Sequence, residues 1–102
     1  TGALADLNKA LELTPDDSGL LLLHGQINSE AGNSNDALED FTRAIGLSSD
    51  YLDAYIARAR EYAIQGNPKL ALGDYNRAIE LQPDNADLYA AFSSSVRRVR
   101  SL

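Results

Sequence analysis

Apolar residues recur every three or four positions along almost the whole chain, and short clusters of Gly, Pro, Asn and Asp interrupt the pattern. That spacing places apolar side chains on one face of an α-helix, whereas a half-buried strand would alternate apolar and polar residues. The pattern predicts six helices, at about residues 2–13, 18–31, 34–47, 52–65, 68–81 and 86–100. We therefore expect an all-α fold of about six helices.

The residues between the predicted helices fit this division. Gly32 and Gly66 stand where a helix is expected to end in a left-handed cap, a conformation that costs glycine little. Asn67 followed by Pro68 predicts a helix N-cap and a first helical residue, because the first turn does not use the N–H that proline lacks. Each of these interruptions thus has a local physical cause.

The predicted helices contain one sequence motif three times, at an interval of 34 residues. The segments ALADLNKALELTP (3–15), ALEDFTRAIGLSS (37–49) and ALGDYNRAIELQP (71–83) align without a gap. Each has Ala in its first and eighth places and a larger apolar or aromatic residue in its fifth. Small residues at fixed points let two helices approach closely. We therefore predict that Ala44 and Ala78 are buried, and that a larger side chain at either costs about 1–3 kcal/mol by overpacking.

These residues resemble the tetratricopeptide repeat (TPR) family. Its 34-residue units carry a small residue at position 8, Gly at 15, Ala at 20, an aromatic residue at 24, Ala at 27 and Pro at 32. In unit 18–51 the matching residues are Gly25, Gly32, Ala37, Phe41 and Ala44, with Ser49 in place of the proline. In unit 52–85 they are Ala59, Tyr62, Gly66, Ala71, Tyr75, Ala78 and Pro83. Ser93 occupies position 8 of the segment that follows.

The resemblance implies a right-handed α-solenoid of antiparallel helix hairpins, in which each hairpin covers the apolar face of its neighbour. We expect a single TPR domain fragment. Residues 1–17 would be the second helix of a preceding repeat, 18–51 and 52–85 two complete repeats, and 86–102 a first-type or capping helix. The chain begins with Thr1 and contains no Met, which also favours a piece of a longer protein.

The net charge and the hydropathy of the chain limit the classes of partner that it is expected to bind. The formal net charge of −6 argues against a nucleic-acid backbone or an anionic membrane surface as the main partner. No apolar run approaches the roughly 18 residues that cross a bilayer, so no membrane insertion is expected. No secretory leader is visible, and we expect a cytoplasmic protein.

Catalytic motifs are missing from the chain. There is no Gly-rich phosphate loop, no nucleophile elbow and no Cys, so we expect no enzyme, no catalytic residue, no cofactor and no metal site. His24 has no second His or Cys to support a metal or catalytic role. His24 and Arg58 share one position of the repeat, and Asp40 and Asp74 share another on the partner helix. We predict that they form ion pairs inside each hairpin, His24 with Asp40 and Arg58 with Asp74.

The family resemblance also implies a binding surface, because first helices of successive TPRs line a concave groove that receives a peptide or a helix. Helical spacing agrees, since Leu22, Gln26 and Ser29 share one face. The predicted groove residues are Leu22, Leu23, Gln26, Glu30, Asp53, Ile56, Ala57, Arg60, Ile64, Asp87, Ala90 and Ser94. The function predicted is a protein–protein interaction module, part of a larger scaffold or adaptor.

Chaperone association stays open. Relatives that bind chaperone tails clamp a C-terminal carboxylate with basic and amide side chains. The matching positions here are Leu22, Gln26, Ala57, Asp87 and Ala91, none of which is basic. We therefore expect no carboxylate clamp within this chain.

A structural alternative is self-assembly through the terminal helices. In residues 1–17 the side chains of Leu4, Leu7 and Leu11 would lack a first helix of their own, and such an apolar face recruits a cover. The cluster VRRVR (96–100) is either a solvated face of a capping helix or a contact for anionic groups of a partner.

Overall fold

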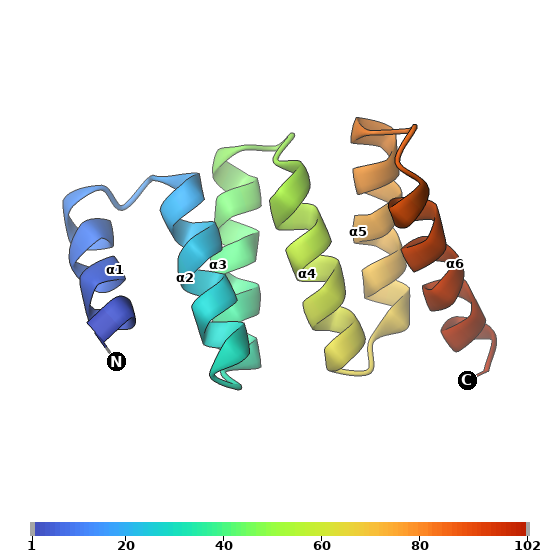
Figure 1. Cartoon of the computed structure of the whole chain (residues 1–102), viewed down its shortest axis with the longest axis horizontal. Coiled ribbons are helices and arrows are strands. Elements are labelled where there is room, and N and C mark those ends of the chain that lie inside the picture. Colours follow the sequence, from blue (N-terminus) through green and yellow to red (C-terminus); the bar gives the residue numbers. More distant parts are fainter. Residues whose placement is uncertain (1, 102) are drawn as a thin grey trace.

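The computed structural model describes residues 2–101, which form six helices and no strand (Figure 1). The helices are α1 (Gly2–Leu13), α2 (Ser18–Glu30), α3 (Ser34–Leu47), α4 (Leu52–Ile64), α5 (Pro68–Leu81) and α6 (Ala86–Arg100). They succeed one another along the longest dimension of a 43 × 26 × 18 Å molecule. In Figure 1, α2, α4 and α6 lie in front of α3 and α5. The predicted all-α solenoid of helix hairpins is confirmed.

Helices α2 and α4 each end one residue earlier than predicted, at Glu30 and Ile64. Both end in the same way, with a glycine of positive φ two residues later, 84° at Gly32 and 79° at Gly66. The next amide reaches back to the helix, and Asn33 N donates to Asn28 O at 2.8 Å. This is a Schellman cap, which closes the helix before the glycine.

The expected N-terminal caps are only partly present. Asn67 is the N-cap residue of α5 and Pro68 is its first helical residue, as predicted, but the Asn67 side chain makes no capping hydrogen bond. Its backbone N–H is already used in the Schellman cap of α4. Two other helices have a side-chain cap. Asp17 Oδ1 accepts a hydrogen bond from Leu20 N of α2 at 3.1 Å, and Asn85 Oδ1 accepts one from Asp87 N of α6 at 3.0 Å.

Small residues bring the helices of each hairpin together. Ala44 and Ala78 are fully buried, which confirms the prediction. Phe41 packs over Gly25 so closely that a Cβ at Gly25 would lie 2.5 Å from the Phe41 ring. Any side chain at that point of α2 would therefore force the Phe41 ring to shift.

Both predicted pairs within the hairpins are present. His24 Nδ1 lies 2.5 Å from Asp40 Oδ2, and Arg58 donates to both carboxylate oxygens of Asp74 at 2.7 and 2.8 Å. The hydrogen bond with Asp74 raises the pKa of Arg58 above its ordinary value. Each basic residue also bonds to the helix that precedes its own hairpin, α1 for His24 and α3 for Arg58. His24 Nε2 lies 2.8 Å from Asn8 Oδ1, and Arg58 donates to Thr42 Oγ1 at 3.3 Å.

The terminal helices differ from the sequence-based expectation in two places. Leu7 is buried rather than exposed, and Leu4 and Leu11 are half-buried, because α1 packs against α2 of the next repeat. Ser93 is exposed although its counterparts Gly25 and Ala59 are buried, because no second helix covers that face of α6 in the described chain.

Candidate functional site

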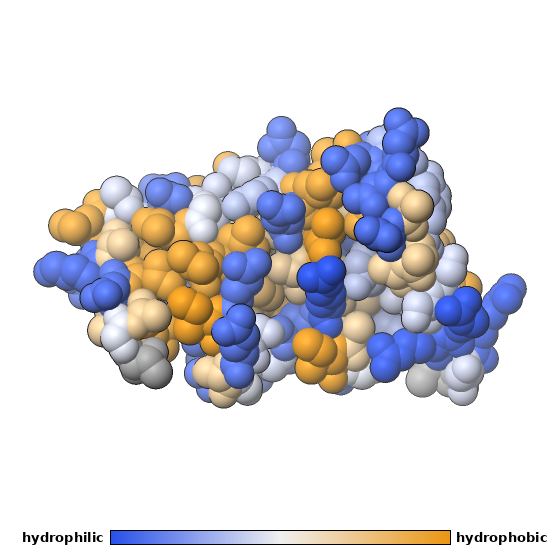
Figure 2. Space-filling model, in the orientation of Figure 1, coloured by the Kyte–Doolittle hydropathy of each residue, from blue (hydrophilic) through white to orange (hydrophobic). Residues whose placement is uncertain are grey.

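A cavity of about 380 Å³ lies between α2 and α4. Both are first helices of a hairpin, and they also contact each other directly. Figure 2 shows the surface that α2, α4 and α6 present to the viewer. The residues that line the cavity are Gln26, Ser29, Glu30, Phe41, Ala57, Arg60, Glu61 and Ile64.

The lining combines an apolar edge with polar groups. Ile64 is 71% exposed, while Phe41 is buried at the inner end of the cavity. Glu61 is buried as well and accepts a hydrogen bond from Ser34 Oγ. Gln65 Nε2 donates to the same Ser34 hydroxyl at 2.9 Å. The C-terminal end of α4 is thus fixed to the start of α3, which gives the cavity a defined shape.

Two family models describe this architecture. A tetratricopeptide repeat model matches residues 18–51 and a second one matches residues 52–85. Together they cover two thirds of the chain, and the matched ranges are two consecutive 34-residue units. The chain belongs to the tetratricopeptide repeat family.

Solved TPR structures share the fold. A crystal structure of MamA superposes with a TM-score of 0.89 at 23% identity, covering 93% of this chain and 56% of that one. The first TPR of Spaghetti (RPAP3), bound to an HSP90 peptide, gives 0.90 at 20% identity, over 96% and 78% of the two chains. A TPR protein of Thermus thermophilus gives 0.85 at 27% identity, over 93% and 48%. The chain thus spans about half the length of MamA and of the Thermus protein. No curated protein matches its sequence.

The structure brings five of the predicted groove residues into the cavity between the first TPR helices: Gln26, Glu30, Ala57, Arg60 and Ile64. Six more lie on the same helices outside it, of which Ile56 is half-buried and the others are exposed: Leu23, Asp53, Ile56, Asp87, Ala90 and Ser94. Leu22 is only 7% exposed and packs in the core with Leu21 and Phe41. It therefore has little surface to offer a partner, because a run of four leucines on a helix covers the core as well as the groove side.

Three cavity residues were absent from the predicted set: Ser29, Phe41 and Glu61. Ser29 shares the helix face of Gln26 and could have been included by spacing alone. Phe41 belongs to α3, a second TPR helix, and its ring reaches the cavity beside Gly25. The signal was the glycine at position 8, which leaves room for a ring from the partner helix.

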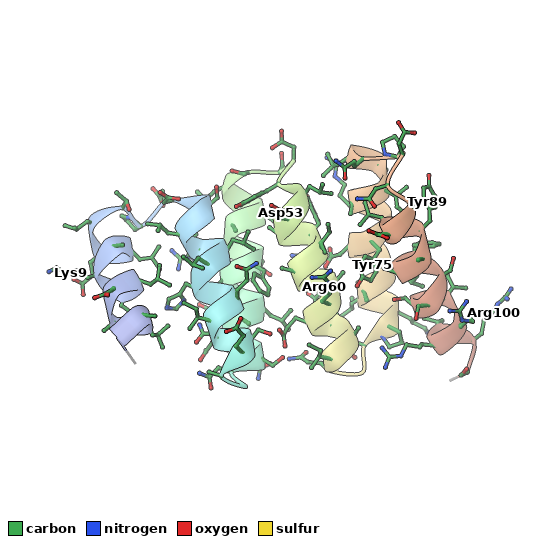
Figure 3. All side chains as sticks on the ribbon, in the orientation of Figure 1. Lys9, Asp53, Arg60, Tyr75, Tyr89 and Arg100 are labelled. Atoms are coloured by element: carbon green, nitrogen blue, oxygen red, sulfur yellow. The ribbon has the colours of Figure 1, made fainter. Side chains whose placement is uncertain are left out.

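Arg60 connects the cavity with α5. Figure 3 shows Arg60 on α4 and Tyr75 on the helix behind it. Burial raises the pKa of Tyr75 above its ordinary value, and the positive charge of Arg60 opposes part of that rise.

A second cavity, also of about 380 Å³, lies among α1, α2 and α3. Its polar lining includes His24, Asn28 and Asp40, and Asn28 Nδ2 donates to Asp40 Oδ2 at 3.0 Å. These groups satisfy one another, and residues 2–101 contain no group of three or more His, Cys, Asp or Glu placed to hold a metal. Likewise, none of the described helices is long and apolar enough to cross a membrane.

Proposed function

We propose that this TPR segment is a non-enzymatic interaction module that binds a peptide or helix of a partner protein on the surface formed by α2, α4 and α6. We call this surface the groove, and it comprises the cavity residues with Leu23, Asp53, Ile56, Asp87, Ala90 and Ser94. The module would act as part of a larger scaffold or adaptor. The observation that carries the proposal is the cavity between α2 and α4, with the exposed apolar side chain of Ile64 beside it.

The chemistry of the cavity suits a mixed apolar and polar segment. Ile64 and Ala57 offer apolar contact, and Gln26, Ser29 and Glu30 offer hydrogen-bonding groups, a combination that is typical of binding sites. The fixed C-terminal end of α4 reduces the entropy lost on binding. Together these features favour a ligand that buries one apolar side chain and hydrogen-bonds around it.

The Spaghetti structure keeps a chaperone peptide among the candidate ligands. Recognition of an acidic C-terminal tail through a carboxylate clamp would need basic and amide side chains at the positions of Leu22, Gln26, Ala57, Asp87 and Ala91. None of these residues carries a positive charge. We therefore propose a mode of recognition that does not depend on such a clamp.

A selection from a random 12-residue peptide library displayed on phage tests the proposal. The test variant, Leu23→Ser/Ile64→Ser, removes two apolar side chains that are 45% and 71% exposed. The matched control, Leu13→Ser/Leu70→Ser, removes two exposed leucines from the second helices α1 and α5. We expect enriched peptides whose affinity falls about tenfold or more in the test variant, since buried apolar surface drives such contacts, and stays unchanged in the control. No enrichment, or equal loss in both variants, would reject the proposal.

Self-association is a second candidate function. It is favoured by residues of the two terminal helices that are exposed although their counterparts in other repeats are buried. Tyr89 on α6 is 47% exposed, whereas its counterparts Leu21 and Tyr55 are 0% and 9% exposed. Ala3 on α1 is exposed, whereas its counterpart Ala37 is fully buried. Within residues 2–101 neither face is covered, so a second copy could cover them in an open stack. Light scattering over a concentration series decides this, and a monomer throughout would reject it.

A further inference from the structure

The charges of the chain are distributed unequally along the solenoid. Residues 1–51 contain nine acidic and two basic residues, and residues 52–102 contain six acidic and seven basic ones. The formal charges of the two halves are therefore −7 and +1. Because the helices follow one another along the long axis (Figure 1), this difference is a charge gradient along the molecule.

The three first helices, which form the groove, show the same gradient. Helix α2 carries one formal charge, the carboxylate of Glu30, for a total of −1. Helix α4 carries two acidic and two basic residues and is neutral. Helix α6 carries Asp87 against three arginines, for a total of +2. The net charge of the first helices therefore changes from negative at α2 to positive at α6.

Three residues at position 13 of successive repeat frames make this gradient specific. They are Glu30, Ile64 and Arg98, each 34 residues from the next, and all three are exposed. Glu30 and Ile64 both line the cavity. Position 13 thus presents an acid on α2, an apolar side chain on α4 and a base on α6.

The charged members of this row are available to a partner. Within residues 2–101 no hydrogen bond or ion pair engages the carboxylate of Glu30 or the guanidinium of Arg98. Favourable interaction with the helix macrodipole explains a cation at the end of α6. It does not explain the contrast with α2 and α4, whose last turns contain no basic residue.

We propose that the groove binds its partner segment in one orientation. A basic side chain of the segment faces Glu30, an apolar side chain contacts Ile64, and an acidic group faces Arg98. This inference rests on the proposed function and adds the chemical class of the ligand. Packed helices lie about 8–10 Å apart, and an extended chain spans about 3.3 Å per residue. Helices α2 and α4 contact each other, so the basic and the apolar ligand residue are expected about three positions apart, and the acidic residue at least as far beyond the apolar one.

The same peptide selection tests the orientation. Peptides that depend on Leu23 and Ile64 should carry a basic and an acidic residue about six or more positions apart, with an apolar residue between them. For a synthetic peptide of the enriched sequence, Glu30→Gln and Arg98→Gln should each weaken the affinity about threefold, the scale of an exposed ion pair. Replacing the acidic residue of the peptide by its amide should remove the sensitivity to Arg98→Gln, because the two groups form one pair.

Two matched control variants distinguish these specific ion pairs from a general effect of the net charge on binding. Arg100→Gln makes the same change of charge two residues away, and Figure 3 shows Arg100 pointing outward from the end of α6. Glu39→Gln makes the same change as Glu30→Gln on the exposed surface of α3. Both controls should leave the affinity almost unchanged.

The outcomes distinguish the inference from the function on which it rests. Groove-dependent peptides that lack the two charges, or equal effects of Arg98→Gln and Arg100→Gln, would overturn the orientation and leave the proposed function intact. A selection without enrichment would reject the proposed function, and the orientation with it.

Discussion

The two complete hairpins, α2–α3 and α4–α5, solve the same packing problem with different residues. At one pair of positions the first hairpin has His24 and Asp40, and the second has Arg58 and Asp74. Both arrangements join an acid on the second helix to a basic side chain on the first. The comparison shows that either a histidine or an arginine on the first helix can pair with the acid on the second.

The neighbouring contact shows the same principle for volume. In the first hairpin Phe41 lies against Gly25, where a methyl group has no room. In the second hairpin Tyr75 packs with Ala59, whose methyl group is fully buried. The interior is close-packed, so a smaller side chain on one helix requires a different placement of the ring on the other.

Removal of the acids should give the largest effect and separate the two hairpins. Asp74→Ala leaves Arg58, whose side chain is 19% exposed, without its main partner, and we expect a loss of about 3 kcal/mol in the free energy of unfolding. Asp40→Ala should cost less, about 2 kcal/mol, because it removes one hydrogen bond from His24, whereas Asp74→Ala removes both charge-assisted hydrogen bonds from Arg58. Urea denaturation measures both values, with Glu39→Ala as the exposed control. Equal losses for the two acids would contradict the distinction.

Replacement of Gly25, the small residue of the first hairpin, should have an intermediate effect on the free energy of unfolding. Gly25→Ala places a methyl group against the Phe41 ring, which costs about 1–3 kcal/mol. The gain in helix propensity returns about 1 kcal/mol, so we expect a net destabilisation of about 1 kcal/mol by urea denaturation. In a chain that already carries Phe41→Leu, the substitution Gly25→Ala should cost less stability than it does in the unaltered chain. If Gly25→Ala stabilises the chain, the close approach at this point does not limit the packing.

The smallest effect concerns Tyr75, which has a hydroxyl where Phe41 has none. Because burial raises the pKa of Tyr75 in the folded state, its contribution to stability is complete below the ordinary tyrosine value of 10.0 and declines as the pH rises through the folded-state value. Thermal unfolding between pH 8 and 11 should therefore show a shallower alkaline decline for Tyr75→Phe than for the unaltered chain. Tyr89→Phe, at an exposed position, serves as the control and should follow the unaltered chain.

Much of the fold was predictable because its determinants are local or repeated. The 34-residue interval and the small residues at Ala44 and Ala78 predicted the helices and their buried contacts, which the structure confirms. The recurring base and acid predicted the pairs of Arg58 with Asp74 and of His24 with Asp40.

Features that depend on a third element were not predictable from one helix pattern. The sequence does not show that Leu22 packs in the core while Leu23 remains 45% exposed, since both belong to the same leucine run. Nor does it show that Leu7 is covered by the following repeat, or that Ser93 is left uncovered. Five of the predicted groove residues line the cavity, and their role in binding stays a prediction.

The bonds that His24 and Arg58 make to the preceding repeat have a consequence for adaptability. Rotation of α2 or α4 about its own axis would break contacts with two second helices at once, through Asn8 and Asp40 for α2 and through Thr42 and Asp74 for α4. At the corresponding position α6 has Phe92, an apolar side chain that can turn against its neighbours without losing a directed bond. We therefore expect α6 to adjust when a ligand arrives while α2 and α4 keep their orientation, and backbone relaxation measured by NMR with and without peptide would detect the difference.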